Sequence, residues 1–118
     1  MSVYDKNNVF AKILRQEIPA TPLYEDDRVA AFRDISPQAP THILIIPKKS
    51  IATPNDLAAT DAELIGHMVL TAQKIAVQEG IDENGYRLVM NCNAGGGQSV
   101  YHLHLHLLGG RQMHWPPG

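Results

Sequence analysis

The segment from Tyr101 to Leu108 restricts the fold of this chain more than any other feature of its sequence. Histidines and leucines alternate along it, in the order His102, Leu103, His104, Leu105, His106 and Leu107. Because successive side chains of a β-strand point to opposite faces, this spacing predicts a strand with the imidazoles on one face and the leucines on the other. A register slip of one residue would bury the histidines, so the pattern also fixes which face packs on the core.

Two interpretations of this strand do not make the histidines themselves catalytic. A half-buried structural strand alternates polar and apolar residues, although three histidines within five residues are unusual for a solvated face. Metal binding is the other, because histidine is a common zinc ligand. Residues four apart in a strand are separated by about 13 Å, so a further donor such as His42 or Cys92 would be needed. The chain has no Cys-x-x-Cys or Glu-x-x-His spacing, and we expect neither a metal nor another cofactor.

Phosphoryl chemistry fits the same strand better. A neutral imidazole is a nucleophile near pH 7, and neighbouring imidazoles can donate hydrogen bonds to phosphate oxygens. The glycines at 95–97 offer backbone N–H groups for the same purpose. A hydrogen bond from one ring nitrogen to a backbone carbonyl would direct the lone pair of the other nitrogen outward. These residues predict a double displacement through a histidine–phosphorus bond.

The rest of the chain favours an α+β fold with an antiparallel sheet. Phe10, Ile13 and Leu14 predict a short helix over 8–16, and a capping-box pattern at 60–63 predicts a second helix that ends at Gly80. Strands are expected at Leu23–Glu25, Val29–Asp34, His42–Pro47, Tyr86–Asn91 and Tyr101–Leu108. Their hairpin-length connections favour antiparallel pairing, and Gly95–Gly97 is expected to form a flexible loop.

Length and charge restrict the partners of the protein. A chain of 118 residues predicts one domain over 1–118, with 109–118 as a C-terminal tail near the active site. The formal net charge of −2 gives no reason to expect a nucleic acid polymer as a partner. The single cysteine, Cys92, and an N-terminus without a signal-peptide pattern predict a cytoplasmic location, and no apolar run is long enough for a membrane span.

The run from His102 to Leu108 matches the pattern His-φ-His-φ-His-φ-φ and therefore resembles the histidine triad (HIT) proteins. The segments 34–42, 96–101 and 109–118 are similar to the histidine triad nucleotide-binding (Hint) branch of that family. Dinucleoside polyphosphate hydrolases resemble the chain less, because they usually follow the triad with a Pro-Arg-containing segment. The resemblance implies a five-stranded antiparallel sheet with two helices, paired as a homodimer with a continuous sheet.

The activity that the resemblance implies is hydrolysis of purine nucleoside 5′-phosphoramidates, including adenosine or guanosine phosphoramidate and lysyl- or aminoacyl-AMP. A covalent nucleotidyl-histidine intermediate would form. A nucleotide-binding regulatory module with incidental hydrolysis is the alternative, because fold alone does not separate a binding module from an enzyme. Dinucleoside polyphosphate hydrolysis is the other alternative. The intact triad and Ser99 favour the enzyme.

The resemblance also implies a role for individual residues. His104 resembles the nucleophile, His106 the residue that binds the phosphoryl oxygens, and His102 and His42 the histidines that orient the nucleophile and complete a proton relay. Asp34 resembles the acceptor for the ribose hydroxyls, a task that suits a carboxylate. The base slot would consist of Phe10, Ile18, Phe32 and Ile35; the phosphate and leaving-group contacts would be Asn91, Gly97, Gln98 and Ser99; and Trp115 would reach toward the site of the partner chain.

Several of these residues also have a structural interpretation. Phe10, Ile18 and Phe32 could serve only the core, Asp34 could close the turn at Ser36-Pro37, and His42 could be a hydrogen-bonded core histidine. The run Cys92-Asn93-Ala94-Gly95 departs from the acidic and serine residues that many relatives carry there. We expect this departure to alter substrate preference or rate rather than the type of reaction.

Overall fold

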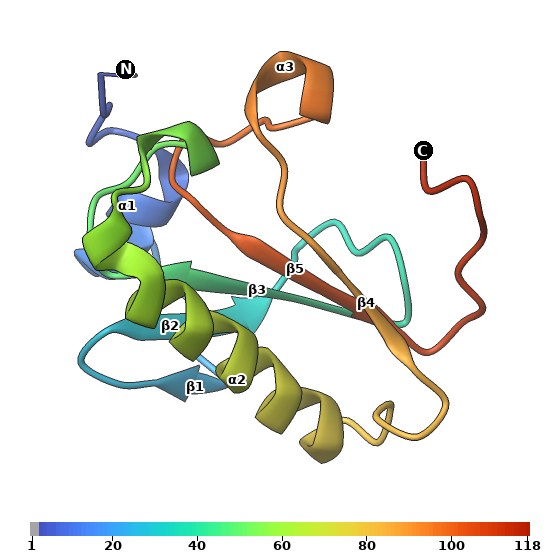
Figure 1. The fold of residues 1–118 in the computed structure, drawn as a ribbon. Helices are drawn as coiled ribbons and strands as arrows, with labels where there is room; N and C mark the ends of the chain where they lie inside the picture. Colours follow the sequence, from blue (N-terminus) through green and yellow to red (C-terminus); the bar gives the residue numbers. More distant parts are fainter. Residues whose placement is uncertain (1–2) are drawn as a thin grey trace.

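The structure, a computed structural model, describes residues 3–118 and contains a five-stranded antiparallel sheet with the order β1-β2-β3-β5-β4. Figure 1 shows the strands, which are β1 (Tyr24–Glu25), β2 (Val29–Arg33), β3 (Thr41–Pro47), β4 (Tyr86–Val89) and β5 (Leu105–Gly109). The predicted α+β class with an antiparallel sheet is therefore confirmed. The strand that carries the last histidine of the triad, β5, lies between β3 and β4.

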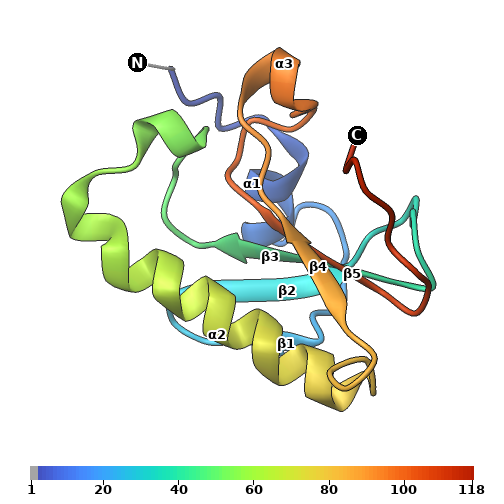
Figure 2. The same cartoon turned by 45° about the vertical axis from the view of Figure 1, so that its right-hand side comes forward.

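The two main helices lie on opposite faces of this sheet (Figures 1 and 2), α1 (Val9–Leu14) on one and α2 (Ala62–Gln78) on the other. Three shorter helical segments are η1 (Pro54–Asp56), η2 (Ala59–Asp61) and α3 (Asn93–Gly96). The helix α1 is shorter than the predicted 8–16. It begins after Asn8, whose side chain accepts a hydrogen bond from the N–H of Ala11, and Gln16 beyond its end adopts a left-handed φ of 63°.

The leucines of the triad segment face α2, as the alternation predicts. Leu103, Leu105 and Leu107 are at most 4% exposed and belong to the larger core, which includes Met68 and Ile75 of α2. Burial of each leucine stabilises the fold by about 1.5–3 kcal/mol. The cost of exposing three leucines fixes the register of the strand and keeps the histidines on the other face.

The face toward α1 holds a smaller core made of Phe10, Ala30, Phe32, Leu44 and Ile46. Leu44 of β3 pairs with Phe32 of β2 on one side and with His106 of β5 on the other. Residues directly opposite each other in an antiparallel pair share a face, so His106 lies on the α1 face. The sheet therefore separates the imidazoles from the leucine core.

The last strand begins at Leu105 rather than at Tyr101, which corrects the predicted strand over 101–108. The final pair in its ladder with β3 joins Ile45 to Leu105, although β3 continues to Pro47 beside β2. Residues 101–104 therefore lie beyond the ladder, where the N–H of Leu103 donates to the carbonyl of Ile51 at 2.7 Å. The alternation of faces still continues through 101–104, with His102 and His104 buried on the α1 side.

Two local predictions were wrong. The pattern at 60–63 does not cap the long helix, because the Asp61 carboxylate accepts the N–H of Ala58 instead. A capping box with a side-chain acceptor lies elsewhere, at the start of η1. There the Thr53 side chain accepts a hydrogen bond from the N–H of Asn55, and this is the only such box among the described residues. Of the glycines expected in a flexible loop, Gly95 and Gly96 lie in α3, and Gly97 follows its end with a left-handed φ of 84°.

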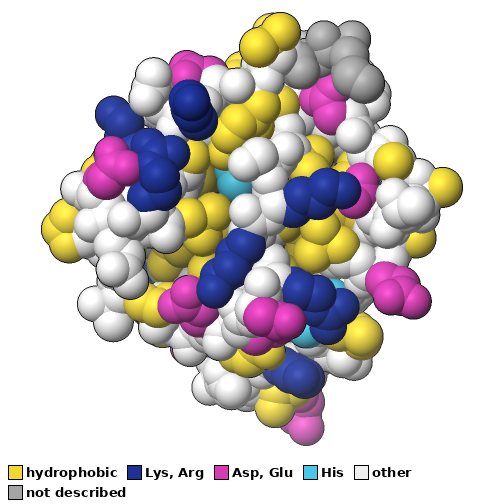
Figure 3. All heavy atoms as spheres, turned by 90° about the vertical axis from the view of Figure 1, so that its left-hand side faces the viewer, with side chains coloured by type: hydrophobic (Ala, Val, Ile, Leu, Met, Phe, Trp, Pro, Cys, Tyr) yellow, Lys and Arg dark blue, Asp and Glu magenta, His cyan; other side chains and the backbone are white. Residues whose placement is uncertain are grey.

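No helix in the described part of the chain, residues 3–118, is long and apolar enough to cross a membrane. On the face shown in Figure 3, Lys and Arg side chains alternate with Asp and Glu side chains, and hydrophobic side chains lie between them. This mixed surface agrees with the formal net charge of −2. That face offers no continuous basic surface for a polyanion.

Candidate active site

A cavity of about 640 Å³ opens between α1, the segment after it and the α1 face of the sheet. This volume falls in the usual range for small-molecule sites. The cavity is lined by eight of the residues expected at the site, namely Phe10, Ile18, Phe32, Asp34, Ile35, Ser99, His104 and His106. The structure thus brings together residues that lie almost a hundred positions apart in the sequence.

The aromatic residues in the apolar part of the cavity were expected either to line a site or to pack in the core, and they do both. Phe10 and Phe32 are each 7% exposed and meet edge to face, with ring centroids 5.7 Å apart. They belong to the smaller core and line the cavity at the same time. Ile35, which also lines the cavity, is fully exposed. The two phenylalanines expected in the base slot are therefore part of the core as well as of the cavity wall.

One ring nitrogen of His104, Nδ1, is hydrogen-bonded to the backbone, and the other, Nε2, takes no part in that bond. Its Nδ1 lies 2.7 Å from the carbonyl oxygen of His102. A carbonyl oxygen only accepts, so Nδ1 carries the proton and the neutral ring keeps a lone pair on Nε2. The ring is 7% exposed, lines the cavity and stands 5.0 Å from the ring of Phe10. This is the orientation that the sequence predicted for a nucleophile.

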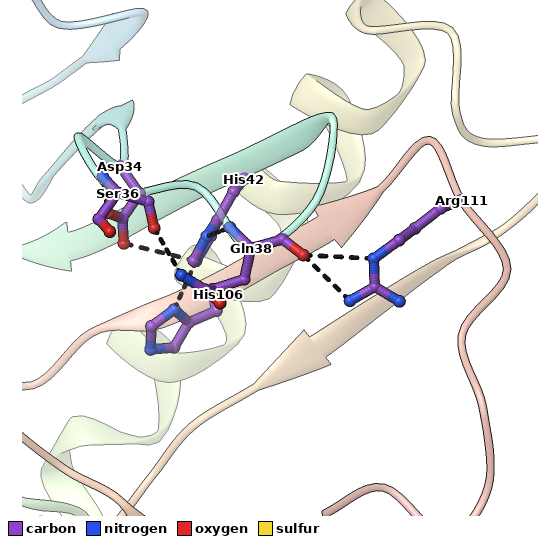
Figure 4. Close-up of polar contacts among 6 residues, drawn as sticks. All are labelled: Asp34, Ser36, Gln38, His42, His106 and Arg111. Carbon is purple, nitrogen blue, oxygen red and sulfur yellow. Dashed lines mark hydrogen bonds and ion pairs between the residues drawn. The ribbon is translucent and has the colours of Figure 1, made fainter.

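His106 and His42 form a hydrogen-bonded chain that begins at a backbone amide (Figure 4). The N–H of Gln38 donates to Nδ1 of His42 at 3.0 Å, so the proton of neutral His42 is on Nε2. Nε2 of His42 lies 2.9 Å from Nδ1 of His106 and donates to it. The proton of neutral His106 is then on Nε2, where it can be donated to a ligand. The backbone amide of Gln38 thus sets both tautomers.

Burial keeps these imidazoles neutral. It lowers the pKa of His106 to about 4, with a further lowering from His104 and His42. Burial also lowers the pKa of His104, although its bond to the His102 carbonyl acts in the opposite direction. The pKa of His42 falls for the same reason, opposed by the charge of Asp34. Near pH 7 the site therefore presents a lone pair on His104 and an N–H donor on His106.

Asp34 closes a turn and lines the cavity at once. Its Oδ1 accepts the backbone N–H of Ser36 at 2.8 Å, as expected for a turn-closing aspartate. Its Oδ2 lies 3.5 Å from Nε2 of His42 (Figure 4). The side chain is 20% exposed. An oxygen that faces the cavity and is partly solvated can accept hydrogen bonds from sugar hydroxyls.

His102 supports the site from behind. Its ring is fully buried, and Nε2 donates to the carbonyl of Pro47 at 2.7 Å. Nδ1 is 2.6 Å from the hydroxyl of Tyr4 and accepts a hydrogen bond from it. The part of His102 that orients the His104 ring is its carbonyl, not its own ring. Tyr4 had no signal in the sequence, because a single aromatic residue ahead of the first helix predicts no contact.

A family model described as the HIT domain matches residues 15–113, which is most of the chain. The chain belongs to the HIT family. Among curated relatives, "Purine nucleoside phosphoramidase" of Escherichia coli K12 is 59% identical over 108 residues, covering 92% of this chain and 91% of the relative. "14 kDa zinc-binding protein" of Zea mays is 53% identical over 116 residues, covering 97% and 90%.

Solved structures of HIT proteins match the fold as well as the sequence. The crystal structure of a HIT family hydrolase from Legionella pneumophila Philadelphia 1 superposes with a TM-score of 0.92 at 62% identity. The match covers 95% of this chain and all of that one. The sheet and helices of this chain therefore have the HIT fold.

Not every residue expected at the HIT site lines the cavity. Gln98 is 6% exposed, and its amide donates to the carbonyls of Ala52 and Val100 while its Oε1 accepts the N–H of Asn93. The backbone N–H of Gln98 also donates to Asn93. Gln98 therefore holds the loop after α3 in place, and its expected role as a phosphate or leaving-group contact stays a prediction.

The remaining residues lie around the cavity or away from it. The N–H of Gly97 donates to the carbonyl of Ala94 at 3.0 Å, so it is used inside the loop. Asn91 is half-buried ahead of α3 and is not among the lining residues of the cavity. Trp115 is 81% exposed, with its ring 6.0 Å from Cζ of Arg87, and does not line the cavity of its own chain.

Proposed function

We propose that this HIT protein hydrolyses purine nucleoside 5′-phosphoramidates, such as adenosine or guanosine phosphoramidate and lysyl- or aminoacyl-AMP. The observation that carries the proposal is the His104 tautomer. The bond from Nδ1 to the His102 carbonyl leaves the lone pair of Nε2 available at the cavity. The name of the 59% identical E. coli relative, a purine nucleoside phosphoramidase, supports the same substrate class.

In the first displacement, Nε2 of His104 attacks the α-phosphorus. The P–N bond breaks with its electron pair on the nitrogen, and the amine takes a proton from the solvent as it leaves. Nε2 of His106 donates its proton in a hydrogen bond to a non-bridging oxygen, where negative charge accumulates in the transition state. The positive charge on His104 is stabilised by the His102 carbonyl, which already accepts the Nδ1 proton.

In the second displacement, water attacks the same phosphorus and the bond between phosphorus and Nε2 breaks. The nucleoside monophosphate is released, the proton of the water passes to solvent, and His104 returns to the neutral form. The bonds from Gln38 through His42 to His106 keep the donor on the same nitrogen through both steps. Ser99, which lines the cavity, is proposed as the leaving-group contact.

Substrate binding is assigned to two parts of the cavity. Asp34 would accept the ribose hydroxyls, and the aromatic and aliphatic side chains of the base slot would pack on the base. Apolar contacts of this kind select a flat purine by shape and do not read its edge by hydrogen bonds. We therefore propose that both adenine and guanine nucleotides are accepted.

A homodimer with a continuous sheet is proposed on the exposed edge of β4. This strand is paired on one side only, with β5, and all its residues are half-buried. The helix α2, which packs on one face of the sheet, exposes Val69, Leu70 and Val77. Natural proteins protect unpaired strand edges, and pairing with a second copy would cover both features. In such a dimer Trp115 would be free to reach the cavity of the partner.

Metal binding is the second candidate function, favoured by one cluster. Donor atoms of Asp34, His42 and His106 lie within 4.8 Å of one another, and the Zea mays relative is named a zinc-binding protein. Two nitrogens on one tetrahedral zinc ion stand about 3.3 Å apart. The His42 and His106 nitrogens are 2.9 Å apart, which is a hydrogen-bond distance. The observed spacing fits a shared proton better than a shared ion.

A substrate panel tests the proposed function. The purified protein is incubated separately with adenosine phosphoramidate, adenylylated lysine, diadenosine polyphosphates and a sugar nucleotide, and release of the monophosphate is measured. We expect turnover of the first two substrates. Preferred cleavage of diadenosine polyphosphates would replace the proposal by the alternative hydrolase, and tight purine monophosphate binding without turnover would support a regulatory module.

A further inference from the structure

The nucleophile lies on a piece of chain that the sheet does not hold. His104 precedes the first paired residue of β5, Leu105, so no ladder hydrogen bond fixes residues 101–104. The position of His104 depends on other contacts. One is the backbone bond from Leu103 to Ile51, and another is the bond from the His102 ring to Pro47. These contacts tie the segment to the end of β3 and the chain that follows it.

A third contact comes from the N-terminal segment. The hydroxyl of Tyr4 lies 2.6 Å from Nδ1 of His102, and the two rings meet edge to face at 5.7 Å. The ring of Phe10 closes the same space, with its centroid 6.4 Å from His102 and 5.0 Å from His104. Both ring nitrogens of the fully buried His102 therefore have partners, and one partner is Tyr4.

We infer that Tyr4 is a positioning residue for the hydrolysis, acting through His102 on the direction of the His104 lone pair. The hydroxyl donates to Nδ1 of His102 and holds the ring with its Nε2 proton on the Pro47 carbonyl. This fixes the peptide of His102. The carbonyl of that peptide accepts the hydrogen bond from Nδ1 of His104. The inference rests on the proposed role of His104 as the nucleophile.

Tyr4 lies outside the part of the chain that the family model matches, which begins at residue 15. It is also absent from the residues that line the cavity. The contact therefore belongs to the N-terminal segment of this chain and touches neither the base slot nor the phosphate. Loss of the hydroxyl should change the chemical step and leave substrate binding nearly intact.

The test replaces Tyr4 by Phe, which keeps the ring packing and removes the proton donor. The acceptor Nδ1 of His102 is then buried without a partner, and the ring and its peptide gain freedom to move. We expect kcat for adenosine phosphoramidate to fall about tenfold, with KM unchanged within about twofold. We also expect the ¹⁵N resonance of the His102 Nδ1 in the unliganded protein to move toward that of an unbonded acceptor.

The matched control is Tyr24→Phe. Tyr24 also loses a hydroxyl hydrogen bond, in this case to the Asp26 carboxylate, but it packs against the core on the α2 face. We expect a similar decrease in the melting temperature of both variants and a normal kcat for Tyr24→Phe. A merely structural role for Tyr4 would give both variants the same normal kcat, and that result would overturn the inference.

The nitrogen spectrum keeps this test separate from the proposed function. If the wild-type protein failed to hydrolyse any phosphoramidate, the proposed function would fail, whereas the spectrum would still report whether Tyr4 holds His102. An unchanged His102 Nδ1 resonance in Tyr4→Phe would show that the hydroxyl does not determine the state of that ring, and it would refute the inference whatever the activity.

Discussion

Stability should fall in acid because the folded protein keeps His106 neutral. Burial and the neighbouring imidazoles lower the pKa of His106 to about 4, whereas histidine in the unfolded chain has a pKa of about 6.5. Below pH 6.5 the unfolded chain binds a proton that folded His106 does not. The corresponding stability is therefore fully present above pH 6.5 and is lost as the pH falls toward 4.

The expected size follows from this difference in pKa. One unit corresponds to about 1.4 kcal/mol, and at pH 4.5 nearly two units of the difference are expressed, which gives about 2–3 kcal/mol from His106 alone. The test variant is His106→Asn, because the Oδ1 of asparagine can still accept the proton of His42. We expect the variant to lose less stability than the wild type between pH 7.5 and 4.5, by about 2–3 kcal/mol.

This difference is measured by urea unfolding at both pH values and at fixed protein concentration, with circular dichroism as the signal. The control is His114→Asn in the exposed tail, which should show the acid sensitivity of the wild type. Equal loss of stability in the wild type and in His106→Asn would refute the reasoning, since it would mean that the folded site protonates His106 as readily as the unfolded chain does.

Three further predictions concern the cavity and the loop beside it. Asp34→Asn should raise KM for adenosine phosphoramidate about tenfold or more, because an amide replaces the charged acceptor for the ribose hydroxyls; an unchanged KM in steady-state assays would remove Asp34 from that role. Gln98→Ala should lower the free energy of unfolding by about 1–3 kcal/mol because it leaves buried backbone groups without partners. A variant of wild-type stability with a raised KM would contradict this and support Gln98 as a phosphate contact. Exhaustive chelation should leave kcat and the melting temperature unchanged, and loss of activity that zinc restores would establish the metal interpretation of the Asp34 cluster.

The sidedness of the sheet was predictable because it depends on local alternation. Three leucines spaced by two residues have one favourable arrangement, and the structure buries all of them on the α2 face. The start of β5 was not predictable in the same way. It depends on where the chain before Leu105 leaves β3 in the folded protein: the β3–β5 ladder stops at Ile45, although β3 itself continues to Pro47 beside β2. Alternation continues past the last ladder bond, so the pattern alone overestimates the strand.

The capping pattern at 60–63 failed for a related reason. A carboxylate such as Asp61 can accept from several nearby N–H groups, and here the N–H of Ala58 and the ammonium of Lys49 occupy it. The folded path of 53–61 through two 3₁₀ segments decides between these partners. Gly95–Gly97 was similarly misjudged, since the short helix α3 depends on bonds from Gln98 that connect it to Ala52.

The composition of the site was predictable in part. The triad and the segments 34–42, 96–101 and 109–118 carried the resemblance, and from these the cavity is lined by Asp34, Ile35, Ser99, Val100, His104 and His106. The tautomers of His42, His106 and His102 were not predictable, because they are set by backbone atoms of Gln38 and Pro47 whose positions depend on the fold. Tyr4 was missed entirely, since its contact spans 98 positions and follows no motif.

The covalent bond between His104 and phosphorus is the central claim, and rapid-quench mass spectrometry tests it most directly. The protein is mixed with adenosine phosphoramidate, quenched in base within the first turnover, digested and analysed for a nucleotidyl adduct. We predict an adenylyl group on the peptide that contains His104, located on that residue by fragmentation and absent from His104→Asn. Turnover without any adduct, or an adduct located on another residue, would contradict the account.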